Sequence, residues 1–104
     1  MFKLIERSQN RLRFLLGSGF RAGIWTLDRT SDAAEFTHLA FLIPYRRTRW
    51  VLSEIKSVVV TRKEGGKFYY PVLEGSFGRN IAVGGYGKQD ALKATHAIRD
   101  FIAA

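Results

Sequence analysis

The chain has 104 residues, with 17 Lys and Arg against 9 Asp and Glu, which leaves a formal net charge of +8. This length fits one compact domain and argues against two. An apolar content of 46% with 13% aromatic residues supplies a packed core and excludes intrinsic disorder, and the absence of cysteine excludes a disulfide framework, a thiolate zinc site and a cysteine nucleophile.

The N-terminal segment lacks the features of a secretory signal. Charged residues, among them Glu6, Arg7 and Arg11, interrupt every candidate apolar region. The longest apolar run covers residues 39–43, whereas a membrane-spanning helix needs about 20 residues. We therefore expect a cytoplasmic protein without a transmembrane segment, whose contact with a membrane would be peripheral.

The first half of the chain reads as a series of short strands separated by turns. The polar residues 8–10 separate two strand-like segments, which predicts an N-terminal hairpin over about residues 2–17. The β-forming residues 24–27 follow, and an Asp- and Ser-containing turn ends them. Residues 35–43 form a long extended candidate that Pro44 interrupts, and proline predicts an edge, a bulge or a bend there.

The second half continues this pattern and ends in a helix. Alternation resumes over residues 46–51, a corner follows, and Gly65 and Gly66 mark the clearest hairpin turn. After Gly87 the apolar residues recur at helical spacing, which predicts a helix over about residues 88–103 with Gly87 as its N-cap. The remaining strand candidates are residues 58–60, 68–73 and 80–83.

The fold class that follows is mainly β, with seven or eight antiparallel strands and one C-terminal helix. A sheet of that size curls into a barrel or splits into two layers, and the helix would cover an open end or face. Alternation along the strands assigns large apolar side chains to the core. These include Trp25, Leu39, Phe41, Trp50 and Val58.

Two stretches resemble a known family. Residues 47–58 (RTRWVLSEIKSV) are similar to the strand, "LSEI" corner and strand of small bacterial pleckstrin-homology-like (PH-like) domain proteins. Residues 81–83, the Gly-rich turn after them and residues 90–102 resemble the last strand and helix of the same domains. The resemblance implies a single PH-like domain over residues 1–104, a strongly bent barrel closed at one end by its helix. None of these motifs is catalytic.

The residues that could carry catalysis are sparse. His38 and His96 have no second histidine at metal-ligand spacing, and no Gly-X-Ser-X-Gly elbow is present. The acidic residues Asp28, Asp32 and Glu35 cluster near one turn, where a solvated loop is the simpler interpretation than a carboxylate pair. We therefore expect no enzymatic activity, no catalytic residues, no metal site and no cofactor.

Basic residues in the predicted N-terminal hairpin are the first binding candidates. Lys3, Arg11 and Arg13 look like the Lys-Xn-Lys/Arg-X-Arg phosphoinositide signature of the first hairpin of some PH domains. Strand side chains alternate, so Arg11 and Arg13 project from one face. The alternative is a solvated hairpin whose charges serve solubility.

A second basic pair lies on the strand after Pro44. Alternation places Arg47 and Arg49 on one face together with Tyr45, and turns Arg46 and Trp50 to the other. Guanidinium groups match phosphate geometry and an aromatic ring stacks on bases, so this face can bind an anion. The alternative is a set of cross-strand ion pairs with Glu35 or Glu54.

The sequence thus predicts a non-enzymatic interaction module. It would bind an acidic protein partner or an anionic headgroup through a basic face. The alternative function is a nucleic-acid-binding basic β-domain, which the charge favours although no recognised nucleic-acid motif is present. The binding prediction depends on whether the arginines meet on one face. The candidate residues are Lys3, Arg11, Arg13, Arg47 and Arg49.

Overall fold

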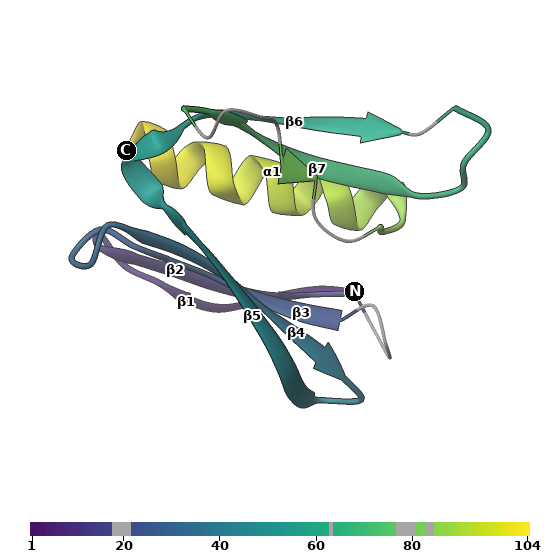
Figure 1. Ribbon diagram of the computed structural model, residues 1–104, viewed down its shortest axis with the longest axis horizontal. Helices are drawn as coiled ribbons and strands as arrows, with labels where there is room; N and C mark the ends of the chain where they lie inside the picture. Colours follow the sequence, from purple (N-terminus) through teal and green to yellow (C-terminus); the bar gives the residue numbers. More distant parts are fainter. Residues whose placement is uncertain (18–21, 63, 77–80, 83–84) are drawn as a thin grey trace. The chain divides into compact units, whose positions relative to one another are not determined.

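The computed structural model describes residues 1–17, 22–62, 64–76, 81–82 and 85–104 (Figure 1). Within them the chain forms eight strands in two antiparallel sheets and one C-terminal α-helix, which confirms the mainly β class. The two sheets are not closed into a single barrel by the described strands. The chain divides into two compact units, residues 1–53 and residues 54–104, which are described in turn.

The first unit is a five-stranded meander in which each strand pairs with the next one along the chain. The first turn is polar: the Ser8 N–H donates to the Arg11 carbonyl at 2.8 Å, and the Ser8 hydroxyl accepts from the Arg11 N–H at 3.1 Å. The strands are β1 (Phe2–Arg7), β2 (Arg11–Leu16), β3 (Ala22–Asp28), β4 (Ala33–Ala40) and β5 (Ile43–Val51).

One face of this sheet is buried and apolar. Side chains alternate between the two faces of a strand, so every second residue of β2, β3 and β4 turns inward. Trp25 anchors this face, with its ring centroid 5.0 Å from that of Phe36 and 5.7 Å from that of Trp50. Each large side chain that is fully buried stabilises the fold by about 1.5–3 kcal/mol. The fully buried set includes Leu12, Phe14, Leu16, Trp25, Leu27 and Phe36.

The opposite face of the sheet is called the outer face here, and it is polar over β2 to β5. Its members alternate with the buried residues, and each is only partly buried or exposed. They include Arg11, Arg13, Thr26, Glu35, Thr37, Arg47 and Arg49.

The expectation that Phe41 belongs to the core is wrong. The structure ends β4 at Ala40, turns at Phe41 and Leu42, and begins β5 at Ile43, so the run of residues 35–43 is not one extended strand. Phe41 lies at the turn with 65% of its surface exposed. Pro44 follows at a register shift in β5, an edge strand, and edges and bulges are the places in a sheet that tolerate a residue without an N–H.

The second unit combines a three-stranded sheet with the helix. After a short 3-10 helix, η2 (Leu52–Glu54), come β6 (Ile55–Arg62), β7 (Tyr69–Gly75) and β8 (Ile81–Ala82), and then α1 (Lys88–Ala103). Gly87 is the N-cap, and the helix buries an apolar stripe that includes Ile98. The Arg99 Nε donates to the Val58 carbonyl at 2.6 Å, which ties α1 to β6. Asn80 and Val83 of the predicted last strand lie outside the described residues.

Candidate functional site

The register of the five-stranded sheet brings the predicted arginines together. Arg13 pairs with Thr26, Thr26 pairs with Glu35, and Glu35 pairs with Arg49. Directly opposed residues point to the same side of a sheet, so these four form one row across β2 to β5. Neighbouring strands lie about 4.8 Å apart, which puts the backbones of Arg13 and Arg49 about 14 Å from one another. Such a span suits a group with several anionic oxygens.

These residues line a shallow depression of about 290 Å³, called the arginine hollow here. It lies on the outer face, and its lining includes Thr26 and Thr37, whose hydroxyls are additional hydrogen-bond donors. Four positive and two negative side chains leave the hollow with a net charge of +2. Its charged members are Arg11, Arg13, Arg47, Arg49, Asp28 and Glu35.

Only part of this positive charge is compensated by ion pairs. The Arg47 Nε lies 3.8 Å from the Glu35 Oε1, so one of the predicted cross-strand pairs exists. The Arg11 Nη1 lies 3.8 Å from the Glu6 Oε1. Both pairs are long and partly exposed, and pairs of this kind contribute at most about 1 kcal/mol. With the described residues, Arg13 and Arg49 form no ion pair within 4.0 Å.

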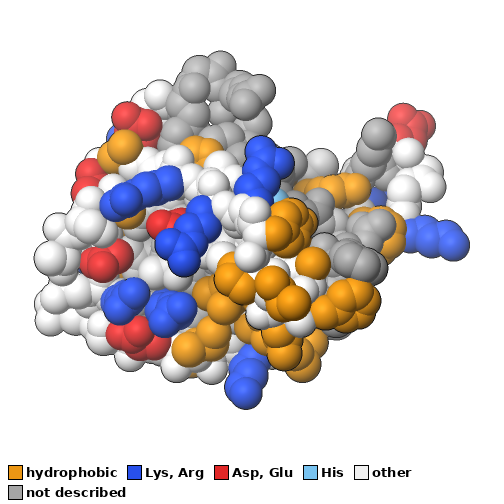
Figure 2. Space-filling model, turned by 60° about the horizontal axis from the view of Figure 1, so that its bottom comes forward, with side chains coloured by type: hydrophobic (Ala, Val, Ile, Leu, Met, Phe, Trp, Pro, Cys, Tyr) orange, Lys and Arg blue, Asp and Glu red, His pale blue; other side chains and the backbone are white. Residues whose placement is uncertain are grey.

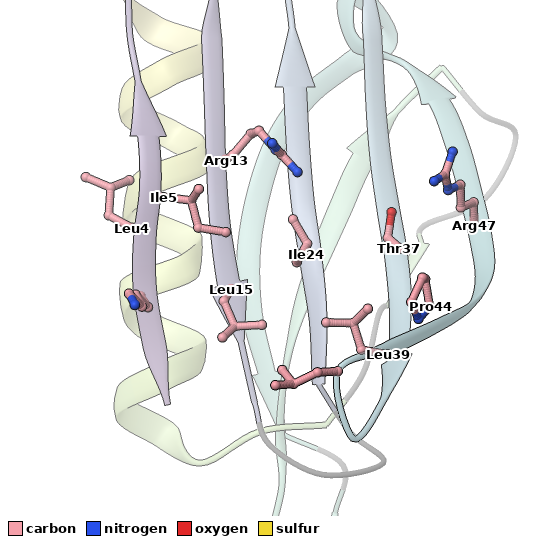
Figure 3. A pocket seen from close by; sticks show the side chains of 11 residues that line it. Leu4, Ile5, Arg13, Leu15, Ile24, Thr37, Leu39, Pro44 and Arg47 are labelled. Carbon is pink, nitrogen blue, oxygen red and sulfur yellow. The ribbon is translucent and has the colours of Figure 1, made fainter.

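A second, larger depression adjoins the first and is called the apolar hollow. It has a volume of about 560 Å³, and Arg13, Thr37 and Arg47 line both hollows. Figure 3 shows Arg13 and Arg47 toward one end and Leu15, Leu39 and Pro44 toward the other. Lys3, the fifth predicted site residue, lines the apolar hollow rather than the arginine hollow.

The outer surface therefore changes character from one side to the other. Figure 2 shows basic and acidic side chains interspersed over one part of this view and hydrophobic side chains gathered over the adjoining part. The acidic members of the arginine hollow were not among the predicted site residues. One of them could have been found from the sequence: if the strand after the N-terminal hairpin pairs with β2, Asp28 lies directly opposite Arg11, as the structure shows.

Tyr45 does not lie beside Arg47 and Arg49, contrary to the prediction from alternation. The register shift at His38 and Leu39 leaves Tyr45 as the extra residue of β5. A bulge of this kind re-aims side chains. The Tyr45 ring centroid lies 5.9 Å from that of His38, which in turn makes an edge contact with the buried Phe36 at 4.6 Å.

The environment of His38 disfavours its charged form. Desolvation by burial, and secondly the positive charge of Arg46, lower the pKa of His38 below its ordinary value of 6.5. Neither His38 nor the exposed His96 is among the residues that line the two hollows. In the described part of the chain, His, Asp and Glu side chains form no group of three that could hold a metal ion.

Among the described residues, no helix has the length and apolar character needed to cross a membrane. Comparison with known proteins adds no relative: no family model matches the chain, and no curated protein or solved structure matches it either. The candidate site therefore rests on its own geometry.

Proposed function

We propose that the chain is a non-enzymatic binding module whose arginine hollow recognises an anionic group. The group would be a phosphate or carboxylate presented by an acidic protein or by an anionic headgroup. We further propose that the chain folds as a PH-like domain with a bent barrel and is located in the cytoplasm. The order of the strands and the C-terminal helix supports that fold assignment.

The observation that carries the proposal is the convergence of four arginines on one hollow. Arg11 and Arg13 come from β2, and Arg47 and Arg49 come from β5, more than thirty residues later. Guanidinium groups bind phosphate and carboxylate oxygens with two parallel hydrogen bonds, which single lysines cannot do. Arg13 and Arg49 form no ion pair with the described residues, and the buried Arg13 Nε has no hydrogen-bond partner among them, so no acidic side chain there compensates these two charges.

Nucleic acid fits the same hollow less well. Its phosphates would suit the arginines, but recognition of single strands also uses aromatic rings on which bases stack. No aromatic side chain is among the described residues that line the arginine hollow. Tyr45, the candidate for stacking, lies against His38.

The decisive experiment removes two arginines and compares anion binding. Inositol hexakisphosphate and poly-L-glutamate serve as phosphate and carboxylate probes, in titrations at low and high salt. We expect salt-sensitive binding that the double variant Arg13→Gln and Arg49→Gln weakens by about tenfold or more, because a hydrogen bond to a charged group contributes about 1.5–3 kcal/mol.

A matched control removes the same charge elsewhere. Lys56 on β6 and Lys93 on α1 are exposed and lie in the second unit, so the double variant Lys56→Gln and Lys93→Gln should bind nearly as well as the native chain. Equal losses in the two double variants would reduce the effect to net charge and contradict the proposal. A parallel titration with duplex DNA tests the nucleic-acid alternative, which binding far tighter than that of both probes would favour.

A further inference from the structure

Exposed apolar side chains gather at the β4–β5 turn of the five-stranded sheet and beside the apolar hollow. Among the described residues, eight large hydrophobic side chains are exposed, and six of them lie on the β4–β5 turn, just after it, or beside the apolar hollow. The most exposed three are consecutive: Phe41 at 65%, Leu42 at 74% and Ile43 at 68%. These three residues are called the apolar tip. The remaining three of the six exposed residues, which are not part of the apolar tip, are Leu4, Ile5 and Tyr45.

The backbone of the apolar tip is unfavourable for the residues that occupy it. Ala40 pairs with Ile43, so Phe41 and Leu42 form a two-residue hairpin turn, with φ of 48° and 70°. A turn with positive φ at both central positions prefers Asn-Gly, because bulky residues are strained there. The chain thus accepts both strain and exposure of apolar surface at the same two positions. Strained residues of this kind are a reason to look for a function.

The residues that follow the apolar tip are ordered by polarity along β5. Pro44 and the exposed Tyr45 come first, and Arg46 and Arg47 come next. A strand rises about 3.3 Å per residue and Tyr45 is an extra residue, so Ile43 and Arg47 are three paired positions apart, about 10 Å along the strand. An apolar end, an aromatic ring at the boundary and cations beyond it match the order of acyl chains, interface and headgroups in a bilayer.

Positive charge also borders the apolar hollow beside the tip. Leu42 and Pro44 line this hollow together with Arg13, Arg47 and Lys3. Figure 3 shows the two arginines on the same sheet face as the apolar lining residues. Each basic residue near an anionic membrane adds attraction, and the apolar surface adds to it independently of charge.

We propose that the apolar tip inserts into the interface of an anionic membrane while Arg13, Arg47 and Lys3 bind lipid headgroups. This inference rests on the proposed anion binding of the outer face and names the anionic lipid bilayer as the partner. A bilayer fits better than an acidic protein surface, because such a surface would offer the arginines a partner but leave the apolar tip in water.

The test measures partition of the full chain onto vesicles. Vesicles of phosphatidylcholine alone are compared with vesicles of phosphatidylcholine and phosphatidylglycerol in equal amounts. The double variant Phe41→Asn and Leu42→Gly replaces the tip with the favoured turn pair. We expect strong partition onto the anionic vesicles only, and a fall of about tenfold or more for the tip variant, since two large apolar side chains would no longer be buried.

Two further readouts separate insertion from a structural role. The variant Val51→Thr removes exposed apolar surface at the opposite end of β5 and should partition like the native chain. A tryptophan placed by Leu42→Trp should be quenched by brominated lipid, in excess of the quenching seen for the native tryptophans. The melting temperature of the tip variant should equal or exceed that of the native chain, because Asn-Gly adopts the positive φ angles of this turn without strain.

The outcomes separate this inference from the proposed function. Native binding to inositol hexakisphosphate without partition onto anionic vesicles would overturn the membrane inference and leave anion binding intact. Unchanged partition of the tip variant, or absence of quenching at position 42, would also overturn it. Loss of binding by the tip variant to both vesicles and inositol hexakisphosphate would assign the tip a structural role. Failure of the native chain to bind any probe would remove the proposed function as well.

Discussion

Replacing Gly23 with alanine should destabilise the five-stranded sheet severely. Gly23 lies on β3, and a Cβ atom there would overlap the ring of Phe36, with the two Cε atoms at 2.6 and 2.7 Å and the Cζ atom nearer still. The ring cannot withdraw, because it is 1% exposed and packs against Trp25 at a centroid distance of 5.0 Å. Overpacking of this kind costs about 1–3 kcal/mol, and the rigid surroundings place Gly23→Ala at about 3 kcal/mol.

Urea unfolding followed by circular dichroism and tryptophan fluorescence measures this loss. We expect a lower midpoint at an unchanged slope, which indicates a change in stability rather than in the unfolded chain. The double variant Gly23→Ala and Phe36→Leu supplies the control, because the smaller side chain leaves room for the new methyl group. Its coupling energy should be favourable by about 1–2 kcal/mol. A loss below about 0.5 kcal/mol for Gly23→Ala, or additive effects in the cycle, would refute the packing explanation.

Substitutions at three other positions probe separate features. Gly75→Ala would drive a Cβ into the backbone carbonyl of Glu54, which cannot rotate away, so we expect a loss of about 3 kcal/mol in the same urea assay. Asp32 has a φ of 51°, and its carboxylate accepts hydrogen bonds from the backbone N–H and the hydroxyl of Ser53, each at 2.8 Å. Asp32→Ala should therefore lower the free energy of unfolding by about 1–3 kcal/mol. Asp32→Asn should lower it less, because asparagine tolerates a positive φ. The folded-state pKa of His38 lies below its unfolded value of 6.5, so the unfolded chain binds the proton more tightly and stability should fall as pH falls below about 6.5. Melting temperatures between neutral and mildly acidic pH should show this loss in the native chain and a smaller loss in His38→Gln.

Local signals were sufficient to predict most of the elements. The polar turn at residues 8–10 and the strict alternation of β2 correctly turn Arg11 and Arg13 to one face, because strand geometry fixes that period. The helix is equally well determined, with Gly87 at its start and an apolar stripe that includes Ile98. Whether these arginines meet Arg47 and Arg49 could not be predicted, because it depends on strand order, which alternation alone does not contain.

The errors fall where the chain departs from regular geometry. Phe41 sits in a run of apolar residues without glycine, asparagine or aspartate, so nothing in the local sequence indicates the turn that the structure places there. Tyr45 is displaced by a register shift of one residue in β5. Such a shift reverses the face predicted for the side chains that lie between the start of the strand and the shift. Pro44 marks the neighbourhood of this shift but not its position.

Both edge strands of the five-stranded sheet combine a register shift with basic side chains. β1 carries a register shift between Leu4 and Glu6, β5 carries one opposite His38 and Leu39, and basic side chains border each edge. Unpaired strand edges template aggregation, and bulges, proline and positive charge discourage it. The arginines of β5 therefore have a second role beside the proposed anion binding, because they discourage pairing at a strand that has no further neighbour among the described strands of this sheet. A variant that neutralises Arg47 and Arg49 together would expose that edge to a second copy of the chain, so its colloidal stability should decline along with its affinity for anions.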